Sequence, residues 1–481
     1  MKKIIAVGLF LALFAYGCKM GKNYKGTELI MPEAFAQADT ATPIVAADTI
    51  NTDTLDRPLV NDLYWWTIFD DPTLDSLVNE ALLNNRNARI AAENILQARY
   101  ALNIQNANFL PKFDVTAQAS RGNFQLNNIG EESNLFLGAG SLYWEIDFWG
   151  KLRRLSEASR ADLLASEYGY RSLMISLISD VVSTYFSLQR SRSELDISKR
   201  NVALRDSMLT IITARFDKGI VPKIDVNQAQ IQYTIAAGSV PTYTRRVAQT
   251  EHALSVLLGR NPGRIAVGKS LEEQNYDITM PLSTPIDLLE KRPDVLVAEY
   301  ALIAQNARAG AAQANRLPTI SISGLLGVAS NDLSQLSISN PLWNLGGQLV
   351  GPLFYWGQLK RRADIELSKR TQQLANYENT VFNALREVED ALIEIRTAKE
   401  EVAIGEDRVV AALNAQNLSK ERYSQGVTSY LEFLESQRQA FDAELLLAGK
   451  RSELLTAYIK LYKAIGGGWL SEEEKKAAEE Q

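Results

Sequence analysis

Apolar residues recur every seven positions along two long stretches of the chain. One series begins at Met174 and Val181, and the other begins at Val381 and Val388. Further apolar residues complete a 3-4 spacing in parts of each series, which predicts helices that pack at coiled-coil angles. The first stretch, from about Ser156 to Phe216, would be roughly 90 Å long at 1.5 Å per residue.

Each long helical pattern is followed by a turn and a return helix. The return helices are expected at about 224–258 and 431–465. Gly219 and Gly426 stand at the turns, where a helix end favours a residue that tolerates the left-handed conformation. The chain therefore predicts two long helical hairpins.

The periodicity changes from helical to alternating after Pro111 and again after Pro318, because proline cannot continue the preceding helix. Strands are expected at about 111–121, 135–148, 318–329 and 346–355. Alternation over about ten residues fits strands with one lipid face and one wet face, although a soluble hairpin alternates in the same way. Trp149 and Trp356 end the second strand of each pair, as aromatic residues at a membrane interface do.

A single offset of 207 residues relates the two halves of the chain. Trp356-Gly357 falls on Trp149-Gly150, and Gly426 falls on Gly219. The repeated unit is about 200 residues long, far longer than a solenoid repeat of 20–50 residues, so it is a domain-sized unit used twice.

Two strands per unit give four strands per chain, which is too few for a membrane barrel of about eight or more. An open sheet edge in lipid leaves backbone groups unpaired at several kcal/mol each. Either the strands do not cross a membrane, or several copies complete one barrel; two copies would supply about eight strands and three copies about twelve.

The N-terminus is typical of an export signal. Lys2 and Lys3 precede an apolar run that is too short to span a bilayer. Ala15-Tyr16-Gly17-Cys18 resembles a lipoprotein cleavage motif, with Cys18 as the acylated first residue of the mature chain; ordinary signal-peptide cleavage is the alternative. Residues 19–58 are rich in Thr, Asp, Ala and Pro, which indicates a tether.

Composition excludes several classes of function. A net charge of −6 over 481 residues argues against nucleic acid as a partner. The single histidine, His252, and the single cysteine remove most metal sites, thiol chemistry and histidine general-base chemistry. We therefore expect no catalytic residues, no metal and no cofactor. A glycosidase with paired carboxylates is the enzyme alternative, but nothing places such a pair in a pocket on helices this long.

Several motifs occur together along about residues 60–469. They are Tyr64-Trp65-Trp66 with Phe69 and Asp71-Pro72, the two Trp-Gly pairs, Arg215-x3-Gly219, Arg422-x3-Gly426 with Tyr430-Leu431, and the closing stretch Tyr462–Trp469. With the duplication and Cys18, this set resembles the TolC/OprM-type outer-membrane factors.

The resemblance implies an α+β membrane protein. Its duplicated helix-strand-strand-helix unit would form, in a homotrimer, a twelve-stranded β-barrel in the bacterial outer membrane, continued by a long α-helical periplasmic barrel. It also implies a passive efflux conduit, lipid-anchored at Cys18 and gated at the periplasmic helix tips. The implied partners are a periplasmic adaptor (membrane fusion protein), an inner-membrane pump of the RND type and outer-membrane lipid. The pump, rather than the conduit, mainly selects the substrate.

The resemblance also assigns gate residues. Asp225 and Tyr423 match a pair that latches neighbouring helices near the closed tip, while Thr428 stands where the family carries a basic residue. Glu432 and Glu435 match acidic ring positions, and their spacing of three places them on one helix face. Three copies of each would favour cations at a narrow mouth; a solvated helix face is the alternative.

The turns between the paired helices are the expected contacts for the adaptor, although they also fit simple C-capping turns. The residues concerned are Gly219, Ile220, Val221, Gly426, Val427 and Thr428. A lipid-anchored periplasmic coiled-coil protein without a pore is the competing interpretation, and it leaves the alternating segments unexplained.

The predicted divisions follow in chain order. They are a signal peptide at 1–17, a lipidated tether at 18–58, the first repeat at 59–267 with its hairpin at about 151–258, a linker at 268–284, the second repeat at 285–469 with its hairpin at about 358–465, and a disordered charged tail at 470–481.

Overall fold

The structure is a computed structural model of the whole chain. It describes residues 19–27, 31–32, 34–36, 65–123, 132–278, 292–339 and 341–467. The predicted signal peptide, Cys18 and the charged tail lie outside the described residues. The chain divides into two compact units, each containing parts of both repeats. The strand unit is Met1–Leu29, Ala92–Tyr168 and Leu296–Thr380, and the hairpin unit is Ile30–Ala91, Gly169–Val295 and Val381–Gln481.

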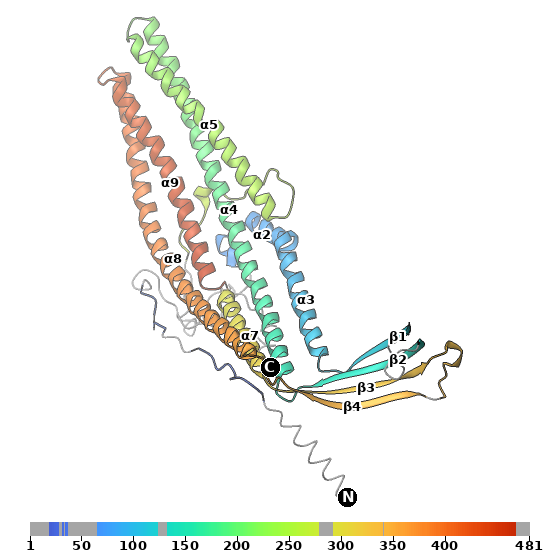
Figure 1. Cartoon of the computed structure of the whole chain (residues 1–481). Coiled ribbons are helices and arrows are strands. Elements are labelled where there is room, and N and C mark those ends of the chain that lie inside the picture. The colour runs from blue at the N-terminus through green and yellow to red at the C-terminus, as the bar shows by residue number, and fades with distance from the viewer. Residues whose placement is uncertain are drawn as a thin grey trace, which may run out of the picture. The chain divides into compact units, whose positions relative to one another are not determined.

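The duplication predicted from the sequence is present in the helices (Figure 1). Three pairs of helices correspond: α3 (Arg86–Ala107) with α7 (Pro293–Ala314), α4 (Lys151–Asp217) with α8 (Gln358–Ser424), and α5 (Lys223–Leu257) with α9 (Tyr430–Ala464). Both ends of every pair differ by the predicted 207 residues. α4 and α8 are each 67 residues long, and each is followed by a 35-residue return helix. The two predicted helical hairpins are therefore confirmed.

The helical pattern predicted as one helix from about 74 to 106 is two helices, and this expectation is corrected. α2 (Pro72–Asn84) stops at Asn85, whose backbone is extended with φ −62° and ψ 131°. The Asn85 side-chain oxygen accepts from the N–H groups of Asn87 at 2.8 Å and Ala88 at 3.2 Å, so it caps α3. Neither glycine nor proline marks this break, and the apolar periodicity runs through it.

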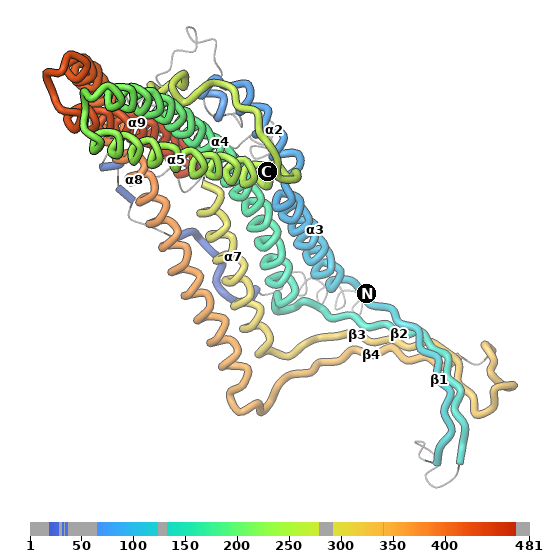
Figure 2. The backbone as a smooth tube through the Cα atoms, turned by 90° about the horizontal axis from the view of Figure 1, so that it is seen from above, coloured from blue at the N-terminus to red at the C-terminus, as the bar shows by residue number. Residues whose placement is uncertain are grey.

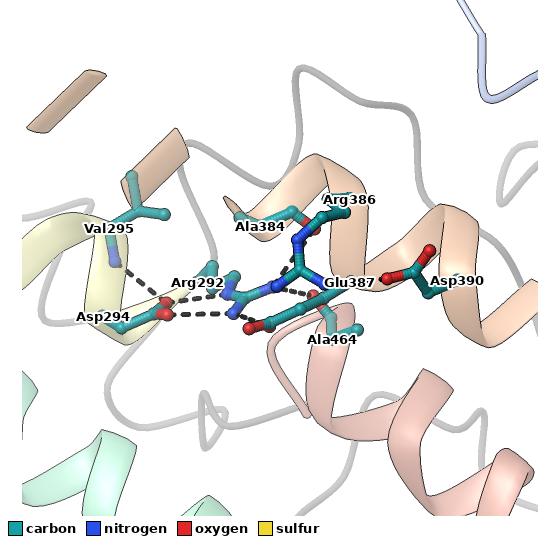
Figure 3. Close-up of polar contacts among 8 residues, drawn as sticks. All are labelled: Arg292, Asp294, Val295, Ala384, Arg386, Glu387, Asp390 and Ala464. Atoms are coloured by element: carbon teal, nitrogen blue, oxygen red, sulfur yellow. Dashed lines mark hydrogen bonds and ion pairs between the residues drawn. The ribbon is translucent and has the colours of Figure 1, made fainter. Parts of the chain in front are cut away.

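The residues that open α3 and α7 tie each return helix to its repeat. The side-chain nitrogen of Asn85 donates to the carbonyl of Leu257 at the end of α5, at 2.8 Å. Arg292, the counterpart of Asn85, donates to the carbonyl of Ala464 at the end of α9, at 2.9 Å (Figure 3). Arg292 also binds Asp294 and Glu387, so this joint includes two carboxylates. The same carbonyl position is held in both repeats by different side chains.

The four strands form one antiparallel sheet in the order β1-β2-β3-β4 (Figure 2). Their bounds are β1 (Lys112–Gly122), β2 (Ser133–Ile146), β3 (Thr319–Ser330) and β4 (Leu342–Val350). β2 and β3 join the two repeats, with Leu142 opposite Gly324. β1 and β4 are the two edges of the sheet.

The second strand of each repeat ends earlier than the sequence predicted. β2 ends at Ile146 rather than 148, and β4 ends at Val350 rather than 355. Gly351 and Pro352 follow β4, and proline has no N–H to donate to a sheet. Trp149 and Trp356 therefore follow the strands instead of ending them.

None of the described helices combines the length and the apolar character that a bilayer crossing needs.

The core of the hairpin unit is built on the heptad residues of α4 and α8. Val181, Leu188 and Val388 are completely buried. The 3-10 helix η2 (Trp65–Phe69) packs into this core, and Trp65 stacks on Tyr462 with ring centroids 4.3 Å apart. The aromatic motif at the start of the folded chain therefore lies against the end of α9.

The described part of the predicted linker packs against this core. η3 (Leu271–Glu273) buries Leu271, and the Tyr458 hydroxyl donates to the carbonyl of Tyr276 at 3.0 Å. Residues 279–284 of the predicted linker lie outside the described residues.

Candidate functional site at the helix tips

The tips of the two hairpins meet in a small apolar cluster within the hairpin unit. It contains Met208, Ile212, Val226, Ala229, Tyr423, Tyr430 and Phe433. The Tyr423 ring stacks on Phe433 at 6.0 Å with an interplanar angle of 7°. Because α4, α5, α8 and α9 all contribute, this cluster joins the two tips of one chain.

The two turns have the same backbone geometry. Gly219 has φ +74° and Gly426 has φ +75°, and an added Cβ at either position would meet nothing within 4 Å. Glycine is therefore present for the left-handed backbone and not for space. The N–H of Ile220 donates to the carbonyl of Arg215, and that of Val427 donates to Arg422, each at 2.9 Å, which closes both helix ends. Ile220 and Val427, which correspond in the two repeats, are both exposed.

The predicted pair of Asp225 and Tyr423 is close, but in the described chain the Tyr423 hydroxyl has no hydrogen-bond partner. Burial raises the pKa of Tyr423, and the charge of Asp225 raises it further, while Arg215 opposes both. The guanidinium of Arg215 lies 5.1 Å from the centre of the Tyr423 ring and donates to the carbonyl of Ser424 at 3.3 Å. Arg215 therefore joins α4 to α8, a role that its motif spacing alone did not reveal.

Glu432 begins the second return helix, at the position that Asp225 occupies in the first. Its backbone N–H donates to the Ser429 hydroxyl at 3.4 Å, and the Thr428 hydroxyl donates to its carboxylate. Thr428 thus supplies a hydrogen bond where the resemblance led us to expect a basic side chain.

Glu435 is paired, which the sequence analysis did not foresee. Arg438 donates to its two oxygens at 3.0 Å and 2.6 Å, and Gln439 donates at 2.9 Å. These side-chain hydrogen bonds, that of Arg438 above all, lower the pKa of Glu435 to about 2. Arg438 also binds Asp442 at 3.0 Å. The spacing of three and four residues on one helix was the available signal for this cluster.

The two interface tryptophans differ in their surroundings. The ring nitrogen of Trp149 donates to the carbonyl of Pro318 at 2.7 Å, and its ring meets Phe148 edge to face at 4.7 Å. Trp356 is 93% exposed, with Phe354 tilted against it at 6.0 Å. The first tryptophan is therefore tied to the sheet, and the second is free to contact lipid or another copy of the chain.

One family model, that of the outer membrane efflux proteins, matches this chain twice. The matches cover residues 77–260 and 284–467, and both of their ends differ by the same 207 residues. The chain belongs to the outer membrane efflux protein family.

Relatives and solved structures agree with this assignment. ArpC of Pseudomonas putida, named an antibiotic efflux pump outer membrane protein, is 31% identical over 471 residues, covering 96% of this chain and 95% of its own. The cation efflux system protein CusC of Escherichia coli is 29% identical over 464 residues, covering 95% and 97%. The Campylobacter jejuni CmeC outer membrane channel has a TM-score of 0.84 at 26% identity, covering 96% and 98%.

Proposed function

We propose that three copies of this chain form the outer-membrane conduit of a tripartite efflux system. The conduit would carry substrates passively from an inner-membrane pump and a periplasmic adaptor to the exterior, and Cys18 would anchor it in lipid. Family membership and the names of the relatives support the efflux role. The observation that carries the trimer is the sheet, which has two unpaired edges.

The edges make a single copy incomplete in a membrane. β1 and β4 carry exposed apolar side chains, among them Val115 and Leu349. Unpaired backbone groups in lipid cost several kcal/mol each, so the edges need partners. Three four-stranded sheets would supply a closed barrel of about twelve strands.

The existing junction between repeats supplies the register for the junction between copies. Within one copy, Leu142 of β2 lies opposite Gly324 of β3. The repeat offset converts Leu142 into Leu349 of β4, and it converts Gly324 into Ala117 of β1. β4 of one copy would then pair with β1 of the next, with Leu349 opposite Ala117.

The helices of the strand unit suggest the same closure. α7 contacts the first repeat through an ion pair between Arg308 and Asp162 of α4. Its inward side chains Ala307 and Ala311 are 0% and 2% exposed, whereas the corresponding Tyr100 and Ile104 of α3 are 62% and 69% exposed. We infer that α3 packs against α8 of the neighbouring copy, as α7 packs against α4 within a copy.

The helix tips are the proposed gate. Asp225 and Tyr423 would hold neighbouring helices in the closed state, and Glu432 and Glu435 would line the mouth. The tip turns, with exposed Ile220 and Val427, would contact the adaptor, while Trp149 and Trp356 would lie at the membrane interface. Exposed apolar residues at both turns, in one backbone geometry, support a repeated docking surface.

The cargo is assigned to the pump and not to this chain. Relatives of 29–31% identity are named for antibiotic, toluene and cation efflux. One conduit architecture therefore accompanies several kinds of cargo.

A cysteine pair tests the trimer and its register. Opposed Cα atoms in antiparallel strands are about 4.5–5.5 Å apart, within disulfide range. Oxidation of a chain carrying Ala117→Cys and Leu349→Cys should give covalent trimers on denaturing gels. Pairing Ala117→Cys with Gln348→Cys moves one thiol to the other face of the sheet, so this control should not crosslink.

The conduit itself is tested by conductance. Purified wild-type trimers should give single-channel steps in planar bilayers. Protein that is native by circular dichroism yet monomeric in mild detergent, and silent in bilayers, would instead support the periplasmic coiled coil without a pore.

A further inference from the structure

Residues 19–27, which the sequence predicted to be part of a tether, lie along the strand unit beside α7 (Figure 2). The N–H of Met20 donates to the carbonyl of Trp149 at 3.1 Å. Asn306 of α7 donates to the carbonyl of Lys22 at 3.0 Å. These contacts use backbone groups of the segment, so its composition did not reveal them.

Arg154 of α4 is at the centre of this contact. Its Nε donates to the carbonyl of Met20 at 2.8 Å, and Nη2 donates to that of Gly21 at 2.7 Å. Its third nitrogen, Nη1, donates to Glu157 at 2.9 Å. The Arg154 side chain is completely buried. A buried guanidinium needs hydrogen-bond acceptors, and two of the three here come from the N-terminal segment.

The fit between the segment and α7 is close. Gly21 has φ +82°, and a Cβ there would lie 2.8 Å from the Cα of Gly310. A Cβ on Gly310 would lie 2.9 Å from Nε of Arg154 and 3.0 Å from the carbonyl oxygen of Met20. Contacts this short displace their neighbours, so two glycines allow the backbones to approach. Arg154, Asn306 and Gly310 thus define a groove, named the Arg154 groove below.

The second repeat provides an internal comparison. Arg361 and Asp364 of α8 correspond to Arg154 and Glu157, and they form an ion pair at 3.6 Å. The side chain of Arg361 is nevertheless 81% exposed. An arginine–carboxylate pair at this helix position therefore does not bury itself. The difference indicates that the N-terminal segment and α7 bury Arg154.

We propose that the Arg154 groove is a docking site for the processed N-terminus and fixes the acyl anchor on Cys18 beside the end of β2. This inference rests on the proposed lipid anchoring. Lys19 follows Cys18 directly, and it is held by an ion pair with Glu157 at 2.8 Å. A free tether of about 40 residues would have a root-mean-square reach of roughly 35 Å. Docking reduces this reach to one Cα–Cα step of about 3.8 Å.

Trypsin tests the docking, because Lys22 and Lys25 are cleavage sites within the segment. The assay uses full-length acylated protein in detergent, with mass spectrometry of the new N-termini. Cleavage of a docked segment requires local opening, so its rate follows the open population. Arg154→Ala should raise the rate of cleavage after Lys22 and Lys25 at least tenfold. Arg361→Ala, the matched control, should leave that rate unchanged.

Two further variants separate the groove from the lipid and from general misfolding. Gly310→Ala keeps all charges and adds one methyl group, and it should also raise the cleavage rate. It decides the question if Arg154→Ala does not fold. Cys18→Ser removes acylation, and its segment should stay protected because the groove holds it.

Three results would overturn the proposal. They are an Arg154→Ala or Gly310→Ala rate equal to wild type, an Arg361→Ala rate raised as much as that of Arg154→Ala, or a Cys18→Ser chain cleaved as fast as Arg154→Ala. Wild-type protein that gives no channel steps but shows the expected trypsin pattern would instead contradict the proposed conduit and leave the docking intact.

Discussion

Replacing Arg438 by glutamine should make ion selection at the tips depend on pH. In the wild type, Glu435 is held by Arg438 through two hydrogen bonds, and its pKa is about 2. A depressed pKa means that the carboxylate keeps its charge as the pH falls from 7 to 4. Arg438→Gln removes the main cause of the shift and also removes one positive charge from each copy.

The pKa values give the expected size of the effect. At pH 4 a carboxyl with a pKa of about 2 is about 99% ionised, whereas one near its ordinary value of 4.5 is only about 25% ionised. At pH 7 both are fully charged. In a trimer the variant would therefore carry about three more negative charges than wild type at pH 7, and it would lose most of Glu435's share by pH 4.

Reversal potentials in planar bilayers under a KCl gradient measure this effect. The variant should be more cation-selective than wild type at pH 7, and this excess should fall with a midpoint near pH 4.5. Arg386→Gln is the matched control, because Arg386 pairs with Asp390 at 2.8 Å on an exposed face of α8 away from the tip. An Arg438→Gln reversal potential equal to wild type at both pH values would refute the placement of Glu435 at the mouth.

Three other predictions follow from the same contacts. Asp225→Ala should raise conductance and antibiotic leakage into cells, and unchanged values would remove Asp225 from the latch. Photo-crosslinkers at Ile220 and Val427 should both capture the adaptor, whereas capture at neither would leave the turns as caps only. Tyr185→Phe removes a buried hydroxyl that donates to Asp71 at 2.6 Å. It should therefore lower stability by about 1–3 kcal/mol, seen as a lower melting temperature by circular dichroism, and an unchanged melting temperature would contradict the role of this bond.

Long-range organisation was readable from the sequence because it rests on repeated local signals. The heptads, the two tip glycines and the change to alternation after each proline fix the helices and strands within a few residues. The offset of 207 residues then orders them, and the double match of the family model follows the same offset. Each signal has a local physical cause that a single sequence displays.

The contacts of individual site residues were less predictable. The partner of Glu435 is a neighbour on the same helix, so helix spacing could have revealed Arg438. Arg215 is different, because it reaches across from α4 to the ring of Tyr423 on α8. Its role depends on how two hairpins pack, and no local pattern encodes that.

Comparing corresponding residues recovers part of what local patterns miss. Asn85 and Arg292 share no chemistry beyond an N–H donor, yet each donates to the last carbonyl of its own return helix. The conserved element is therefore the acceptor, a helix-end carbonyl that lacks a partner in its own helix and needs a donor from outside it. Arg154 and Arg361 show the converse, since identical side chains at corresponding positions end up buried and exposed. A duplicated sequence thus specifies equivalent backbones, and the fate of each side chain depends on which segment, or which copy of the chain, lies beside it.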